Sequence, residues 1–125
     1  MIQEQTILQV IDNSGARTAK CIKVLNRKPY AKIGDLIVVS IIKVKSYGLR
    51  SSKIKKGGVF LALVTGVAFC IRQQGGGTIH TSVNSVCLLN RQKKLLASRI
   101  NKPIARELKK KKLLKAASLS FAGFF

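Results

Sequence analysis

The chain has 125 residues, the size of one ordinary domain, and 46% of them are hydrophobic, which is enough to build a packed core. It carries 24 Lys and Arg residues against only four carboxylates, Glu4, Asp12, Asp35 and Glu107, for a formal net charge of +20. So large a charge is typical of a protein bound to a polyanion, most commonly nucleic acid, and so few acids argue against carboxylate-dependent catalysis.

Runs rich in β-branched residues predict short strands that are separated by turn-forming residues. These strands cover residues 6–11, 19–25, 36–44, 59–72 and 78–90. In the second strand, Ile22 and Val24 are expected to share the inward side. Asp12–Gly15 and Gln73–Gly77 are the clearest turns, because Asp, Asn and Gly favour tight reversals. Short strands at near-regular spacing predict an all-β fold, a small closed barrel that leaves no exposed edge.

The C-terminal part of the chain differs from the strand region in composition. Residues 91–115 hold eleven basic residues against one acid. Pro103 suits the first turn of a helix, and residues 105–115 are rich in helix formers, so we expect a helix to open near Pro103.

The end of the chain combines a lysine run with three phenylalanines, Phe121, Phe124 and Phe125. A basic tail with aromatic residues is expected to be held by partners, with a solvated tail as the alternative. We therefore divide the chain into a β-barrel RNA-binding domain, residues 1–90, and a basic helical extension, residues 91–125, packed on the barrel and on partners.

Side chains suited to catalysis or metal binding are scarce. The single histidine, His80, follows a glycine turn and is expected at the surface. Cys21, Cys70 and Cys87 have neither the close spacing of a zinc site nor the even count of a disulfide framework, so we expect small buried cysteines on strands. The sequence predicts no catalytic residue, no metal site and no cofactor.

Several segments carry a pattern that runs in order through nearly the whole chain. They are Met1–Thr6, Asp12–Arg17, Cys21–Leu25, Ile33–Ile37, Lys55–Gly57, Asn84–Asn90, Ser98–Ile100 and Pro103–Leu108. In these segments the sequence resembles the family of large-subunit ribosomal protein fourteen. The departures from the family pattern are at Gly58, Gly75-Gly76, Thr81 and Ala97-Ser98, and after Leu119.

The resemblance implies a five-stranded barrel with a projecting β-ribbon and short C-terminal helices. It also implies a structural constituent of the large ribosomal subunit that binds large-subunit rRNA at the subunit interface and contributes to a bridge to small-subunit rRNA. The implied protein partners are large-subunit proteins three and nineteen and a ribosome-silencing factor. The alternative is a free-standing barrel that binds single-stranded nucleic acid, which the low content of tyrosine, only Tyr30 and Tyr47, disfavours.

Basic side chains and the first turn supply the predicted RNA contacts, because phosphates attract positive charge and donors. The predicted set is Asn13, Ser14, Arg17, Lys23, Arg27, Lys28, Lys45, Arg50, Lys53, Lys55, Lys56, Arg72, Arg106, Lys109, Lys110 and Lys111. The predicted protein-partner or bridge face consists of Ser98, Arg99, Phe121, Phe124 and Phe125.

The start of the chain carries Glu4 and Asp12 and no basic run, so we expect neither a signal peptide nor a transit peptide. The longest apolar run, Val59–Ile71, is interrupted by Thr65 and Gly66 and is too short to cross a bilayer. Together with the Lys- and Ile-rich composition, this favours a product of an AT-rich organelle genome, in the mitochondrial ribosome of the matrix. A plastid or the bacterial cytoplasm is the alternative location.

Overall fold

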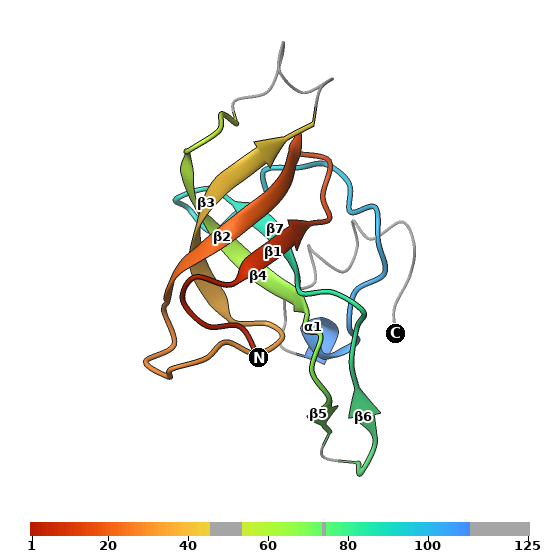
Figure 1. Ribbon diagram of the computed structural model, residues 1–125. Helices are drawn as coiled ribbons and strands as arrows, with labels where there is room; N and C mark the ends of the chain where they lie inside the picture. The colour runs from red at the N-terminus through yellow and green to blue at the C-terminus, as the bar shows by residue number, and fades with distance from the viewer. Residues whose placement is uncertain (46–53, 74, 111–125) are drawn as a thin grey trace.

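The computed structural model describes residues 1–45, 54–73 and 75–110, with side chains up to residue 108. Its centre is a closed barrel in which the strands follow the order β1-β2-β3-β4-β7, and β5 and β6 form a separate ribbon that projects from it (Figure 1). The elements are β1 (Ile7–Val10), β2 (Ala16–Val24), β3 (Leu36–Val44), β4 (Val59–Gly66), β5 (Ile71–Arg72), β6 (Thr78–Ile79), β7 (Ser85–Leu89) and α1 (Glu107–Lys110). The predicted all-β fold with a five-stranded barrel is confirmed.

The barrel closes between its first and last strands. Neighbouring strands pair antiparallel from β1 to β4 and from β4 to β7, whereas β1 and β7 pair parallel, with Gln9 opposite Ser85 and Val10 opposite Val86. This closing pair brings the two ends of the strand region together and leaves no free sheet edge in the barrel.

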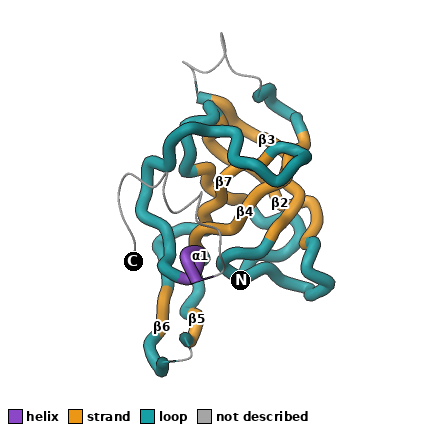
Figure 2. Tube along the Cα trace, turned by 180° about the vertical axis from the view of Figure 1, so that it is seen from behind, coloured by secondary structure: helices purple, strands orange, loops and turns teal. Residues whose placement is uncertain are grey.

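The core fills the barrel through alternation along the strands. In β3, Ile37, Val39 and Ile41 face inward and are buried, while the residues between them are half-buried. Strand β7 is buried along its whole length, because the segment after it folds back, with Leu95 bridging to Leu89. The extension after β7 therefore covers part of the barrel wall, as the view from behind shows (Figure 2).

The two long strands predicted over 59–72 and 78–90 are each divided in two. The barrel ladder ends with a register shift at Gly66, which lies so close to β7 that a Cβ there would be 2.6 Å from Ser85 Oγ. Beyond Gly66 the chain leaves the barrel wall, and the next pair of strands is the β5–β6 ribbon. The predicted continuous strand is thus divided just after the register shift where β4 lies closest to β7.

The tip of the ribbon is the reversal predicted over Gln73–Gly77. The Gln73 amide donates to the carbonyl of Gly77 at 2.7 Å, and the Gly76 amide donates to the carbonyl of Gln73 at 3.1 Å. Gly76 has a φ of 85°, a left-handed conformation that glycine adopts without steric cost. The predicted tight turn is confirmed.

The expectation that Ile22 faces inward is wrong. A β-bulge between Cys21 and Lys23 interrupts the alternation of β2, so that Ile22 is 43% exposed while Cys21 and Val24 are both buried. An extra residue in one strand is invisible to a period-two pattern.

The expectation that a helix opens near Pro103 is also wrong. Ile104 and Ala105 are fully buried against the core, and α1 begins only at Glu107. Packing of two adjacent residues against the barrel overrides the helix propensity of this segment. Residues 111–115 of the predicted helix lie outside the described residues. Within the part of the chain that the structure covers, no helix is long and apolar enough to cross a membrane.

The three cysteines have different surroundings. Cys21 and Cys87 are buried, as expected, but Cys70 is exposed in the segment that leaves the barrel for the ribbon, so the expectation is wrong for Cys70. Burial raises the pKa of the Cys87 thiol, and the nearby carboxylate of Asp12 raises it further, against a smaller lowering by a hydrogen bond with Thr65. Burial also raises the pKa of Cys21.

These environments predict selective thiol chemistry. In the folded protein at neutral pH, one thiol should react quickly with an aromatic disulfide reagent, and the other two should react roughly a hundredfold more slowly or only after unfolding. Cys70→Ser should remove the fast phase and leave the slow one. A fast phase that survives this substitution would contradict the assignment.

Candidate nucleic-acid interface

Three of the four carboxylates accept hydrogen bonds inside the fold. Asp35 accepts from the side-chain amide of Asn26 and from the backbone amide of Lys32, both at 2.8 Å. Glu107 accepts from Gln73 Nε2 at 3.5 Å, and Asp12 has three donors, described below. These acids serve the fold, whereas nearly all Lys and Arg side chains that the structure describes are exposed.

Asp12 is fully buried and holds the turn between β1 and β2. Its Oδ1 accepts from the backbone amide and the hydroxyl of Ser14, and its Oδ2 accepts from the backbone amide of Leu88 in β7 at 2.8 Å. Gly15 follows with a φ of 97°. The predicted turn at Asp12–Gly15 is confirmed, and its carboxylate also fastens it to the far strand of the barrel.

The same turn is joined to the C-terminal extension by the backbone. The Asn13 amide donates to the carbonyl of Arg99 at 3.1 Å, and the Asn101 amide donates to the carbonyl of Ile11 at 2.9 Å. These bonds place Asn13 beside Arg99, although the two residues are far apart in the sequence. Two sequence-predicted groups, the RNA-contacting turn and the partner face with Ser98 and Arg99, thus lie side by side.

Five basic residues gather where β2 begins, β3 ends and β4 begins, and we call this group the basic end. It consists of Arg17, Lys43, Lys45, Lys55 and Lys56. Strands β2 and β3 are joined here by the pairing of Thr18 with Lys43 and by the Lys45 amide, which donates to the carbonyl of Gly15 at 2.8 Å. The segment before β4 is joined to β3 by the Gly57 amide, which donates to the carbonyl of Ile41 at 2.8 Å. Figure 1 shows these three strand ends together at the top of the barrel.

Lys43 of the basic end is absent from the predicted set. It lies near the end of the predicted strand 36–44, and the polar residue in that apolar run was the available signal for an exposed position. Its partner across the sheet is Thr18 of β2, and Ile41, two residues earlier in β3, bonds to Gly57 and Gly58 before β4, so its place in the cluster follows from strand pairing.

A second basic group lies on the loop between β2 and β3, at the other end of these strands. Arg27 and Lys28 are exposed there, and Arg27 adopts a left-handed φ of 61°. The Lys28 amide donates to Asn26 Oδ1 at 2.9 Å, which fixes the loop, and Lys32 Nζ lies 5.7 Å from the centre of the Tyr30 ring. Lys32 was also missed by the sequence analysis.

The remaining described members of the predicted set lie elsewhere. Arg72 is exposed on the ribbon, Arg106 is exposed just before α1, and Lys23 is exposed on the outer side of β2. The hydrogen bond from Gln73 to Glu107 joins the ribbon to α1. Arg72 and Arg106 immediately precede these two residues, so the segments that carry them lie close together. The structure thus distributes the set over several surfaces instead of one patch.

Comparison with known protein families shows to which family the chain belongs. The family model for ribosomal protein L14p/L23e matches residues 1–123. The chain belongs to this family. Membership makes the chain a structural component of the large ribosomal subunit, which works in translation among the RNA and protein components of a ribosome. The L14p/L23e family is one of structural proteins, not of enzymes.

Within this L14p/L23e chain, the described residues include no group of three or more His, Cys, Asp or Glu side chains that could hold a metal ion. His80 is exposed on the ribbon side of the barrel. Some predicted site residues lie outside the described residues or have no described side chain, namely Arg50, Lys53, Lys109, Lys110, Lys111, Phe121, Phe124 and Phe125.

Proposed function

We propose that the chain binds large-subunit rRNA through the basic end. The observation that supports this most directly is the convergence of Arg17, Lys43 and the Lys55–Lys56 pair from three strand ends on one exposed surface. Phosphate groups of folded RNA, spaced along a backbone, are the polyanion that such a cluster of positive side chains fits.

The Asp12 turn supports the same proposal through preorganisation. Asn13 and Ser14 sit on a turn whose carboxylate is anchored to β7, so the backbone of the turn is fixed before RNA arrives, and the exposed Asn13 side chain extends from it. A preorganised turn loses little conformational entropy on binding. The loop with Arg27 and Lys28 and the region of Arg72 and Arg106 supply further phosphate contacts on other RNA segments.

Phosphate contacts of this kind read RNA by its shape. Few aromatic side chains are present in the sequence, at 6%, so base stacking has little part in binding. This also favours the ribosomal role over the alternative, a free-standing barrel for single-stranded nucleic acid.

We further propose that the surface beside the turn, with Ser98 and Arg99, faces the small subunit and its rRNA and contributes to an intersubunit bridge. Large-subunit proteins three and nineteen are the proposed protein neighbours, and a ribosome-silencing factor is proposed to dock on the same face. In the tail, Lys109–Lys111 are proposed to contact RNA, and Phe121, Phe124 and Phe125 to anchor on a partner.

The proposed location is the mitochondrial ribosome of the matrix, with a plastid or the bacterial cytoplasm as the alternative. The support is compositional, namely the Lys- and Ile-rich sequence and a formal net charge of +20. Translation from an AT-rich organelle genome would favour these codons.

Removing the basic end should weaken RNA binding without unfolding the barrel. For Arg17→Ala combined with Lys55→Ala and Lys56→Ala, we expect about a hundredfold weaker binding to a large-subunit rRNA fragment at about 0.15 M salt. The slope of log K against log salt should fall by about one unit for each lost phosphate contact. Affinity measured across a salt series by filter binding or fluorescence anisotropy gives both quantities.

For a comparison at equal charge, the double variant Lys55→Ala with Lys56→Ala is set against Lys93→Ala with Lys94→Ala, which removes the same charge from exposed residues outside the predicted set. An equal loss from both pairs would show that total charge, not position, sets the affinity. Equal affinity of the wild-type chain for single-stranded RNA of the same length would favour the free-standing alternative.

A further inference from the structure

The outer face of the barrel carries an apolar row that crosses three strands. Val38 in β3 pairs with Leu61 in β4, and Leu61 pairs with Leu89 in β7. Residues directly opposite each other share one face of a sheet, so these three side chains line up across the strands. The inward positions of the same strands already fill the core, which leaves this row on the outside.

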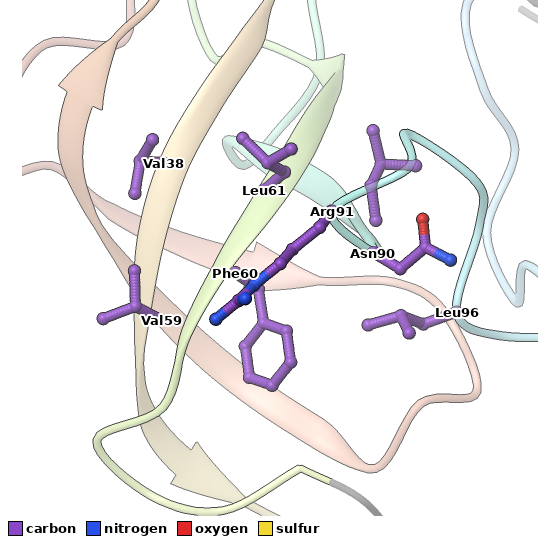
Figure 3. Close-up of a pocket in the computed structure, with 8 residues that line it drawn as sticks. Val38, Val59, Phe60, Leu61, Asn90, Arg91 and Leu96 are labelled. Atoms are coloured by element: carbon purple, nitrogen blue, oxygen red, sulfur yellow. The ribbon is translucent and has the colours of Figure 1, made fainter.

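A hollow of about 500 Å³ lies over this row. Its apolar lining consists of Val38, Val59, Phe60, Leu61, Leu89 and Leu96, and we call these six residues the apolar strip. Val59 is 62% exposed and Leu96 is 37% exposed. Figure 3 shows the strip, with Leu96 brought to its edge by the segment that follows β7. On a chain with a net charge of +20, an exposed aliphatic hollow is unexpected for a surface that meets only solvent or phosphate.

Positive charge borders the apolar strip. Arg91 follows β7 and lines the hollow beside Asn90, where its side chain extends toward Phe60 (Figure 3). Lys23 pairs with Val38 across β2 and β3 and is exposed, but it is not among the residues that line the hollow.

The lining decides between protein and RNA as the occupant. Five of its six apolar side chains are aliphatic and only Phe60 is aromatic, whereas unstacked bases are held by aromatic platforms. Aliphatic hollows with polar rims are typical of protein interfaces. Arg91 at the rim of the hollow can pair with a carboxylate of the occupant.

We propose that the apolar strip is the docking site for a segment of a neighbouring protein that carries aliphatic side chains and a carboxylate. The carboxylate pairs with Arg91, and the aliphatic side chains fill the hollow over Leu61. This contact uses Arg91 and the apolar strip, none of which belongs to the basic end.

The test uses large subunits that contain the full chain with the photo-crosslinker p-benzoylphenylalanine at position 59 or at position 96. We expect both positions to join the same protein segment, and mass spectrometry should find aliphatic residues and an Asp or Glu in the joined peptide. Incorporation of each variant into the subunit shows that it folds. Adducts to rRNA at both positions, or no adduct at either, would overturn the proposal.

A charge reversal at Arg91 tests the carboxylate of the segment. Arg91→Glu should lower the adduct yield at position 59 by about fivefold or more, because an attraction becomes a repulsion, while Arg91→Lys should largely keep it. The control position is 22, since Ile22 is exposed on β2 outside the strip, and its adducts should not respond to Arg91→Glu. If the adduct yield at position 59 were the same with Arg91 and with Arg91→Glu, the proposal would be overturned, whatever the affinity of the basic end for RNA.

Discussion

Replacing Asp12 with alanine should lower the free energy of unfolding by about 3–5 kcal/mol, a large part of the stability of a domain this size. The fully buried carboxylate accepts hydrogen bonds from the backbone amides of Ser14 and Leu88 and from the hydroxyl of Ser14. Alanine leaves the buried Leu88 amide without its acceptor, and each such loss costs about 1–3 kcal/mol.

The effect should extend beyond the turn. Asp12 joins three parts of the chain, since the turn also bonds through its backbone to Ile100 and its neighbours in the extension. Loosening it should therefore weaken both the closure of the barrel at β7 and the attachment of the segment with Ser98 and Arg99. RNA affinity should fall as well, although Asp12 itself is buried away from any ligand.

Urea unfolding at high salt, followed by circular dichroism, measures the change. Asp12→Asn keeps one side-chain oxygen as an acceptor and should lose less than Asp12→Ala. Glu4→Ala removes an exposed carboxylate and should change the free energy of unfolding by less than about 0.5 kcal/mol. If Asp12→Ala and Glu4→Ala were equally stable, the anchoring role of Asp12 would be wrong.

The strands of this fold follow from local chemistry. β-Branched residues and turn residues place all five barrel strands close to where they form, and Leu36–Val44 agrees with the predicted boundaries. The turn at Asp12–Gly15 is equally local, because its side chain bonds to the next residues and its glycine takes the positive φ. What the sequence lacks is the third bond of Asp12, to Leu88 far along the chain.

The errors come from tertiary contacts. The bulge before Lys23 turns Ile22 outward, and β4 ends at the register shift where Gly66 pairs closely with Ser85. Burial of Ile104 and Ala105 delays the helix after Pro103, so that α1 begins at Glu107. In each case a neighbour from a distant part of the chain overrides a sound local preference.

The sequence predicted the class of partner, a polyanion, but not where on the fold the basic residues gather. Charge alone indicated a polyanion partner, yet only strand pairing brings Lys43 next to Arg17 and the segment before β4. The apolar strip left a signal that was open to another interpretation. Leu36–Val44 is apolar at outward as well as inward positions, and the outward Val38 lies in an outer hollow.

The free chain should depend strongly on salt for its stability. Raising KCl from about 0.02 M to about 0.5 M should increase the free energy of unfolding by roughly 3 kcal/mol or more, because counter-ions screen the repulsion within a compact body. The formal net charge is +20, and three of the four carboxylates are already bonded inside the fold. The four carboxylates offset only four of the 24 positive charges, so most of the repulsion among the exposed cations remains.

An RNA fragment should replace salt as the source of counter-charge. At low ionic strength, a stoichiometric amount of large-subunit rRNA fragment should restore a cooperative thermal transition, whereas a neutral polymer of the same size should not. Circular dichroism and light scattering on the RNA-free chain give the reference. A compact monomer that melts cooperatively at about 0.02 M salt, with a midpoint that does not change as salt is added, would show that the barrel core outweighs the charge repulsion.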